Sequence, residues 1–273
     1  MLFRSVWCWG YNASGQLGNG TTTDSSTAIL VPGLTTVSAI TSGGQHTCAL
    51  LANGTVKCWG DNTYGQLGNK TTRTSWTPVT VTSLSGVTAI SAGDNHTCAL
   101  IVTGKVSCWG RNNVGQLGNA KNTNSKKPVP VKGLTKATSI AAGWSTTCAR
   151  LAFGTGRCWG WNAAGQLGNA TNTDSNVPVP DVHVAGAVNS AGLTAITSIS
   201  VGGYHSCARI ADSTATCWGD DSAGELGSGV GNPYTNSNTP APVTNLTDTT
   251  GITAGTNFTC APLPWTVKCW GDN

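Results

Sequence analysis

The chain has 273 residues, among them 36 glycines, 11 tryptophans and 11 cysteines, but only 10% of its residues are charged and one is methionine. Helices of soluble enzymes are usually rich in Glu, Lys and Met, so this composition argues against a helix-rich fold. The net charge is +4, and the sequence shows neither an apolar run long enough to span a membrane nor a signal peptide at residues 1–6.

A repeat of about 50 residues organises the sequence. It opens with Cys-Trp-Gly-Asp-Asn at 58–62, followed by Gly-Gln-Leu-Gly-Asn at 65–69, and Glu225 replaces the Gln in one copy. Equivalent openings lie near Cys8, Cys58, Cys108, Cys158, Cys217 and Cys269. Five full periods and one orphan opening are therefore present, and we expect one repeat domain over residues 1–273.

Four short strands are predicted within one period. In the segment 78–109 they lie, in chain order, at 78–81, 87–91, 96–100 and 105–109. β-branched and aromatic residues fill these runs, and clusters of Gly and Asn separate them. Four antiparallel strands per period are typical of a propeller blade, and a parallel β-helix, whose coils are usually much shorter, is the alternative. We expect an all-β propeller of about five four-stranded antiparallel blades plus one extra strand.

Ten cysteines fall into pairs that flank a predicted turn. In the first pair, a three-residue loop at 52–54 with Gly54 at the position that needs a positive φ places Cys48 opposite Cys58. Opposed β-carbons of a hairpin lie about 4.5–5.5 Å apart, and the closer pairs approach disulfide range. We predict five cross-strand disulfides; zinc binding is the alternative, although zinc ligands usually have CxxC-type spacing. The pairs are Cys48/Cys58, Cys98/Cys108, Cys148/Cys158, Cys207/Cys217 and Cys260/Cys269.

Cys8 is left without a partner, because the period would place that partner before the first residue. We therefore expect the chain to begin inside one blade and, after Cys-Trp-Gly at 269–271, to end inside another. Such a fragment would form an arc with exposed edges. Structural disulfides persist in oxidising compartments, so the pattern also predicts an extracytoplasmic or secreted protein whose signal sequence lies upstream.

The run His-Thr-Cys-Ala-Leu at 46–50, with Gly-x-Val-x-Cys-Trp-Gly-x-Asn-x-x-Gly-Gln-Leu-Gly at 54–68, resembles the repeat of the regulator of chromosome condensation family. The resemblance recurs five times and covers essentially the whole chain. It implies a propeller, usually of seven blades, which at this period needs about 350 residues. The chain would then be a fragment of such a ring, about two blades short.

The resemblance implies a binding face rather than one activity, since the family includes a GTPase exchange factor, β-lactamase inhibitors, ubiquitin-ligase modules and a photoreceptor. The only sizeable insertion, at 182–192, does not suggest the loops of the exchange factor, and its His183 is expected to be solvated. Light sensing would need a tryptophan cluster. The positions equivalent to Trp144 instead hold Gly44, Asp94, Gly203 and Thr256.

Catalytic signals are missing from the sequence. It contains no phosphate-binding loop, no H-E-x-x-H motif and no nucleophile elbow, and the paired cysteines are not free nucleophiles. His46, His96 and His205 stand two residues before a blade cysteine, where Thr146 and Phe258 stand in other repeats. A metal-binding ring would hardly tolerate those replacements, so we expect each imidazole to bond to the backbone of a neighbouring blade. We predict no enzyme activity, no cofactor and no metal.

Comparison of the repeats separates framework from variable positions. Trp9, Trp59, Trp109, Trp159, Trp218 and Trp270 recur and are expected to pack the blades. One variable set follows Cys-Trp-Gly, and a second set, at 44–45, 94–95, 144–145, 203–204 and 256–257, follows the blade glycine. Equivalent loops of a propeller lie on one face, where aromatic and Arg side chains act as interface anchors. The candidate binding rim is centred on two Trp and consists of Tyr11, Arg111, Trp144, Trp161 and Tyr204. The alternative is that these loop residues vary because they have no binding role.

Charge is unevenly distributed along the chain. Residues 95–173 hold nine Lys or Arg and no acid, whereas residues 174–273 hold two bases and eight acids. Nucleic-acid binding needs basic residues that converge on one face, and here they scatter over strands and loops. We therefore expect a protein partner rather than nucleic acid.

The sequence thus predicts a non-catalytic, exported propeller that acts as a protein-binding scaffold through variable loops on one face, without a membrane span in this chain. Two alternatives stay open. One is regulation of a GTPase or another enzyme by nucleotide exchange or inhibition. The other is a structural surface or adhesion module.

Overall fold

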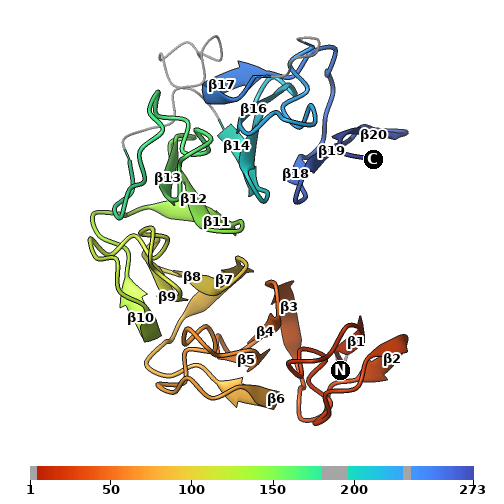
Figure 1. Cartoon of the computed structure of the whole chain (residues 1–273), viewed down its shortest axis with the longest axis vertical. Coiled ribbons are helices and arrows are strands. Elements are labelled where there is room, and N and C mark those ends of the chain that lie inside the picture. The colour runs from red at the N-terminus through yellow and green to blue at the C-terminus, as the bar shows by residue number, and fades with distance from the viewer. Residues whose placement is uncertain (1–4, 180–195, 230–234) are drawn as a thin grey trace.

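The computed structural model describes residues 5–179, 196–229 and 235–273, and every regular element in these residues is a β-strand (Figure 1). None of them forms a helix with the length and hydropathy needed to cross a membrane. The insertion at 182–192, with His183, lies outside the described residues. The chain is therefore all-β, as its composition predicts.

The strands form six antiparallel sheets that follow one another around an open arc (Figure 1). The first sheet contains β1 (Trp7–Gly10) and β2 (Ser25–Leu30). The second contains β3 (Val37–Ser42), β4 (His46–Leu51), β5 (Val56–Gly60) and β6 (Ser75–Thr80). The third contains β7 (Val87–Ala92), β8 (His96–Ile101), β9 (Val106–Gly110) and β10 (Ser125–Pro130).

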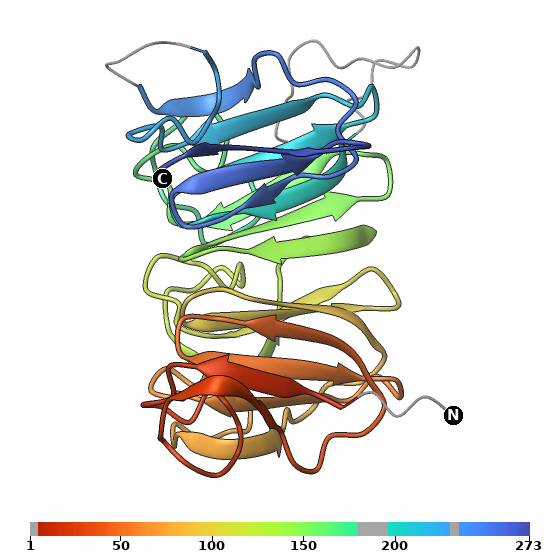
Figure 2. The ribbon, with the colours of Figure 1, turned by 90° about the vertical axis from the view of Figure 1, so that its right-hand side faces the viewer.

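The remaining three sheets complete the arc. The fourth contains β11 (Ala137–Ala142), β12 (Thr146–Leu151) and β13 (Gly156–Gly160). The fifth contains β14 (Ile196–Val201), β15 (His205–Ile210), β16 (Ala215–Gly219) and β17 (Ser237–Pro242). The sixth contains β18 (Thr253–Ala254), β19 (Phe258–Pro262) and β20 (Val267–Gly271). Figure 2 shows the arc from the side, with the N-terminal sheets at one end of the long axis and the C-terminal sheets towards the other.

The sheets divide the strands differently from the sequence repeat. The segment 78–81, expected to share a blade with 87–109, lies in β6 and β6 pairs with β5, with Val79 opposite Cys58. The reason is local, because the outer strand folds back on the strand just before it, and the chain then crosses to the inner strand of the next sheet. Five predicted blades plus one strand thus appear as a two-stranded first sheet, four middle sheets and a three-stranded last sheet. In the fourth sheet, a single bridge between Gly160 and Ser175 replaces the outer strand.

The five predicted disulfides are confirmed. Each joins directly opposed residues of the second and third strands of one sheet, as in Cys48 opposite Cys58. In that hairpin the amide of Leu51 donates to the carbonyl of Thr55, which is the closure expected for the loop at 52–54. Cys8 is the free cysteine among the described residues. The bonded pairs are Cys48–Cys58, Cys98–Cys108, Cys148–Cys158, Cys207–Cys217 and Cys260–Cys269.

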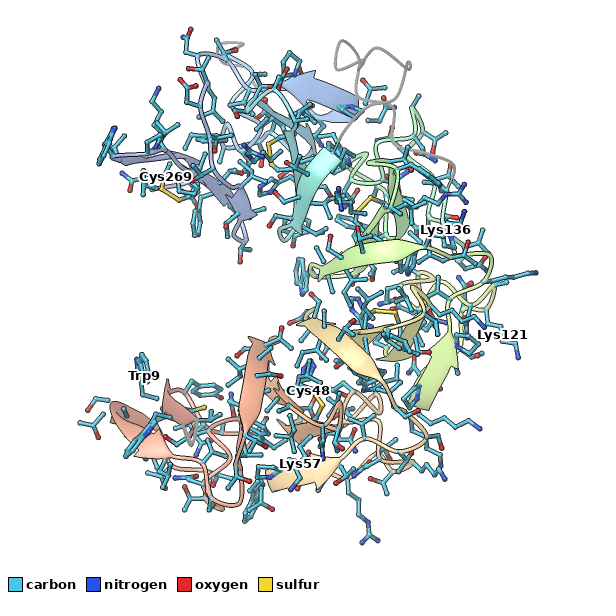
Figure 3. The ribbon with its side chains drawn as sticks, turned by 180° about the vertical axis from the view of Figure 1, so that it is seen from behind. Trp9, Cys48, Lys57, Lys121, Lys136 and Cys269 are labelled. Carbon is cyan, nitrogen blue, oxygen red and sulfur yellow. A yellow bond between two sulfur atoms is a disulfide. The ribbon has the colours of Figure 1, made fainter. Side chains whose placement is uncertain are left out.

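The hydrophobic cores lie between neighbouring sheets. One of five clusters joins Cys58 and Leu67 to Ala99 and Trp109 of the next sheet. The repeat tryptophans of the second to fifth sheets are fully buried, at Trp59, Trp109, Trp159 and Trp218. Trp9, predicted as framework, is instead 66% exposed, whereas a loop of the preceding repeat covers each of those four (Figure 3).

A main-chain carbonyl in each Gly-Gln-Leu-Gly loop holds the next sheet. The carbonyl oxygen of Gln66 accepts a hydrogen bond from the Trp109 indole at 2.8 Å and another from the Thr97 hydroxyl at 3.0 Å. Gly68, at a φ of 66°, lies so close to the Trp109 indole that a β-carbon there would meet Nε1 at 2.8 Å. We call the two hydrogen bonds that this carbonyl accepts, from the indole and from the hydroxyl of the next sheet, the inter-sheet latch. It recurs at Gln16, Gln116, Gln166 and Glu225.

Three buried histidines extend the latch, but not in the way the sequence suggested. The imidazole of His46 contacts the Thr97 side chain of the next sheet, with 2.9 Å between Nε2 and Oγ1, rather than the backbone. His96 contacts Thr147 and His205 contacts Thr259 in the same way, each at 2.8 Å. Because each threonine hydroxyl gives its one proton to the Gln or Glu carbonyl, it accepts a hydrogen bond from the imidazole, whose Nε2 therefore carries a proton.

Burial lowers the pKa of these imidazoles because it penalises the charged form. The pKa falls to about 4 for His46, where the Asp61 carboxylate partly offsets the burial, to about 3 for His96 and to about 4 for His205. All three Nδ1 atoms are buried without a hydrogen-bond partner. A second proton on the imidazole, at Nδ1, would therefore have no hydrogen-bond acceptor.

Replacing Thr97 by Val should destabilise the protein by about 2–3 kcal/mol. The change keeps the shape of the side chain but leaves the His46 imidazole proton without an acceptor and removes one of the two donors to Gln66. Urea unfolding followed by tryptophan fluorescence measures the effect. Thr80→Val, on an exposed site of β6, should change the free energy of unfolding by less than about 0.5 kcal/mol. Equal effects of the two substitutions would contradict the latch.

Acid should weaken the fold as pH falls from about 6.5 towards 4. In that range the unfolded chain protonates its histidines while the folded chain does not, so the unfolded state binds more protons and stability rises with pH. His96→Thr copies Thr146, the residue that the fourth sheet carries at this position. The variant should show a shallower loss of stability between pH 6.5 and 4 than the wild type, by on the order of 3 kcal/mol in total. Parallel pH profiles would show that His96 is not buried and neutral.

Candidate binding face

The loops that follow the inner strands converge at the axis of the arc. Gly93 makes this possible, since a β-carbon there would collide with the carbonyl of Gly143 in the next sheet. Main-chain hydrogen bonds then run from sheet to sheet: the amide of Gly44 donates to Asp94 at 3.0 Å, that of Asp94 to Trp144 at 3.3 Å, and that of Trp144 to Gly202 at 3.3 Å. These bonds hold the loops as one continuous surface.

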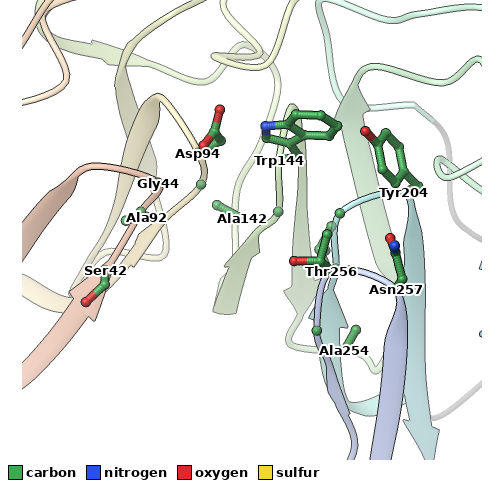
Figure 4. Close-up of a pocket in the computed structure, with 17 residues that line it drawn as sticks. Ser42, Gly44, Ala92, Asp94, Ala142, Trp144, Tyr204, Ala254, Thr256 and Asn257 are labelled. Carbon is green, nitrogen blue, oxygen red and sulfur yellow. The ribbon is translucent and has the colours of Figure 1, made fainter. Parts of the chain in front are cut away.

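A cavity of about 530 Å³ opens where these loops meet (Figure 4). We call it the axial pocket. Its wall comes from the second to the sixth sheet and consists largely of Gly and Ala, such as Gly93 and Ala142. The larger lining side chains are Asp94, Trp144 and Tyr204, joined by Thr256 and Asn257. The second variable set of the sequence therefore surrounds one pocket.

The first variable set is tied to the second by main-chain hydrogen bonds. The amide of Arg111 donates to the carbonyl of Asn95 at 2.9 Å, and the amide of Trp161 donates to Ser145 at 2.9 Å. The same bond joins Asp61 to Gln45, Asp220 to Tyr204 and Asp272 to Asn257. Both sets consequently lie on the same face of the arc.

Three candidate rim residues form one aromatic cluster. The ring centroids of Trp144 and Tyr204 are 4.7 Å apart at an interplanar angle of 82°, and those of Trp161 and Tyr204 are 5.4 Å apart at 68°. Both contacts are edge-to-face, a favourable arrangement for aromatic pairs. The hydroxyl of Thr146 donates to the carbonyl of Trp161 at 2.8 Å and so anchors that residue. Trp144 stays 42% exposed at the mouth of the pocket.

The other two candidates lie apart from this cluster. The Arg111 guanidinium stands over the Tyr64 ring, 5.1 Å from its centroid. Tyr11 is 58% exposed and lines a second cavity, of about 360 Å³, together with Trp7 and Trp9 of the first sheet. The structure therefore brings together Trp144, Trp161 and Tyr204, but not all five residues.

Two carboxylates, those of Asp94 and Asp220, act on the aromatic cluster. Burial raises the pKa of Tyr204, and the Asp220 and Asp94 carboxylates raise it further because they oppose a phenolate. The Asp94 carboxylate accepts a hydrogen bond from the Asn95 amide, and that of Asp220 accepts one from the Ser222 hydroxyl at 2.8 Å. No lysine, arginine or histidine is among the residues that line the axial pocket.

The basic residues of 95–173 do not gather at this pocket. Lys121 and Lys136 lie on the outer side of the arc (Figure 3), and the Lys136 ammonium stands over the Phe153 ring at 5.0 Å. Among the described residues, no group of three His, Cys, Asp or Glu is placed to share a metal ion. The face thus offers aromatic surface and carboxylates.

Sequence reasoning missed a buried asparagine that shapes the loops carrying the first variable set. The side-chain oxygen of Asn62 accepts from the Leu67 amide at 3.0 Å, and its NH₂ group donates to the carbonyls of Thr71 and Arg73. Its recurrence two residues after each Cys-Trp-Gly, as Asn12, Asn112, Asn162 and Asp221, is the signal that could have revealed it.

Comparison with protein families identifies the repeat. The model of the regulator of chromosome condensation (RCC1) repeat matches residues 5–50, 53–100, 103–150 and 158–209. A second model of the same repeat matches residues 37–66, 87–116 and 196–225. No curated protein sequence matches the chain.

Solved structures share the fold at low sequence identity. Human WBSCR16 superposes with a TM-score of 0.84 at 23% identity, over 98% of this chain and 71% of that chain. Prp20p of Saccharomyces cerevisiae, whose structure is described with its binding to Gsp1p and histones, gives 0.79 at 21% identity, over 98% and 65%. The ectodomain of the receptor kinase CR4 of Physcomitrella patens gives 0.51 at 25% identity, over 87% and 51%. The chain thus spans about half to seven tenths of these proteins.

Proposed function

The chain belongs to the RCC1 repeat family, and we propose that it is a non-catalytic, exported scaffold that binds a protein partner with the face around its axial pocket. The observation that carries this proposal is the aromatic cluster of Trp144, Trp161 and Tyr204, of which Trp144 and Tyr204 line that pocket. Exposed Trp and Tyr held on a rigid frame are the residues that most often anchor protein interfaces.

The rigidity of this frame supports a binding role. Neighbouring sheets are joined by the inter-sheet latch on one side and by the main-chain bonds around the axis on the other. Loops held in this way lose little conformational entropy when a partner binds, so their contacts contribute more fully to affinity. The framework residues repeat in each sheet, while the position that holds Asp94 and Trp144, and the next position, which holds Tyr204, vary from sheet to sheet.

Five disulfides support an exported protein. Four of them are fully buried between sheets, and that of the last sheet, Cys260–Cys269, is partly exposed. Such bridges persist in oxidising compartments but are rare in reducing ones. One solved relative of the fold is the ectodomain of a receptor kinase. The structure of another, Prp20p, is described with its binding to Gsp1p and histones. Regulation of a GTPase or another enzyme would be one form of the proposed protein binding, and adhesion would be another.

Alanine at Trp144 or Trp161 should weaken partner binding by about 2 kcal/mol, which is about thirtyfold in Kd, because an anchoring Trp loses most of its buried contact area. The partner is first isolated from the extracellular fraction of the source cells by affinity capture with the wild-type chain. Its Kd is then measured by biolayer interferometry for each variant.

The matched controls are Thr72→Ala and Asn122→Ala, two exposed loop residues away from the axial pocket. They should bind the partner as tightly as the wild type. If all four substitutions leave the Kd unchanged, the aromatic cluster is not an interface. Nucleotide release from a captured GTPase, measured with the wild-type chain and Trp144→Ala, would identify the regulatory form of the function.

A further inference from the structure

We propose that the axial pocket takes up a cationic side chain of the partner, an arginine or a lysine, between the Asp94 carboxylate and the rings of Trp144 and Tyr204. This inference rests on the proposed function and assigns the chemistry that the pocket recognises. Figure 4 shows Trp144 between Asp94 and Tyr204 at the rim of the pocket, with small residues below them.

The two aromatic rings provide the geometry of a cation site. Trp144 and Tyr204 meet at 82°, so their planes form a corner rather than a stack, and a cation placed in it contacts the electron-rich face of one ring and borders the other. Trp is the strongest of the aromatic side chains in attracting Lys, Arg or quaternary ammonium groups, and cages of such rings recognise these cations. Trp161 supports the corner from behind through its edge-to-face contact with Tyr204.

Two carboxylates supply charge complementarity. Asp94 lines the pocket beside Trp144, and Asp220 acts on the same Tyr204 ring from the neighbouring variable set. Among the described residues the hydrogen-bond donors to these two carboxylates are the neutral side chains of Asn95 and Ser222. Neither donor neutralises a charge, so an incoming cation would meet uncompensated carboxylates in a partly desolvated place.

The nearest candidate for an internal cation is already engaged elsewhere. The main chain of Arg111 is bonded to Asn95, next to Asp94, but its guanidinium stands over the Tyr64 ring and is absent from the pocket lining. Among the residues that the structure describes, therefore, no cationic side chain fills the site.

The wall of the pocket leaves room for a long side chain. It is built of residues such as Gly93, Gly143, Ala142 and Ala254, whose packing between sheets excludes larger side chains. A volume of about 530 Å³ accommodates the aliphatic stem of Arg or Lys together with the backbone that carries it. Trp144 and Tyr204 at the mouth are suited to contact the stem as well as the charge.

The test uses a short blocked peptide, acetyl-Gly-Ser-Arg-Ser-Gly-amide, and the same peptide with citrulline, which is isosteric with arginine but neutral. Each is titrated into the full chain, and binding is followed by the NMR shifts of the Trp144 and Trp161 indole N–H signals. The arginine peptide should bind about tenfold more tightly than the citrulline peptide, and this advantage should shrink at high salt.

Asp94→Asn should remove most of that advantage, and Trp144→Ala should abolish the binding of the arginine peptide. The matched controls are Asp248→Asn, which removes a charge at an exposed site outside the pocket where φ is 59°, and Trp265→Ala, which removes a 97% exposed Trp. Both should bind the arginine peptide like the wild type. Equal binding of the two peptides, no binding of either, or an unchanged advantage in Asp94→Asn would each overturn the proposal.

The outcome is separable from that of the proposed function. If the isolated protein partner binds the wild-type chain, loses affinity with Trp144→Ala and keeps it with Asp94→Asn, the face is an interface but the pocket does not recognise a cation. If the arginine peptide binds as expected but the partner is indifferent to Trp144→Ala and Trp161→Ala, the cation site exists and the protein interface lies elsewhere.

Discussion

The arrangement of the whole molecule depends on one main-chain carbonyl per repeat. The oxygen of Gln66 receives the indole N–H of Trp109 and the hydroxyl of Thr97, both from the next sheet, and the same pair of bonds joins each later sheet to its predecessor. Because the acceptor is a backbone atom, the side chain is free to vary between Gln and Glu. That side chain stabilises its own loop, because Gln66 Oε1 and Glu225 Oε2 each accept a hydrogen bond from the main-chain amide two residues earlier.

This latch explains why a chain so rich in small polar residues builds a stable fold. A single four-stranded sheet buries little by itself, but from the second sheet onward stacking places a Trp, a Leu and a disulfide between neighbouring sheets. The polar atoms that enter the interface are paired: the indole and hydroxyl protons bond to the carbonyl, and the imidazole proton bonds to the hydroxyl. The Nδ1 atoms of the three histidines are buried without a partner, so protonation of these imidazoles at low pH would weaken the interfaces.

The same construction separates stability from recognition. Latches and cores occupy the space between sheets, whereas the loops at the axis carry residues that differ at equivalent positions. Trp144, Tyr204 and Asp94 therefore meet around the axial pocket without serving the packing that holds the sheets together. A surface assembled in this way changes its chemistry through single loop residues while its frame stays constant.

The sequence alone determined the hairpin strands, the five disulfides and most of the framework Trp, because these features are local. Cys48 and Cys58 belong to one hairpin, and a turn of known length sets which residues face each other.

Contacts between repeats could not be predicted from the sequence in this way. Periodicity shows that His46 and Thr97 occupy regular positions, but not that their side chains meet across 51 residues. The stacking of the sheets around the axis likewise decides that Trp144 and Trp161 contact Tyr204. It also decides that Tyr11 and Arg111 lie apart from them. Only the tertiary structure sets these distances, because the rotation from one sheet to the next, rather than the spacing along the chain, decides which variable loops become neighbours.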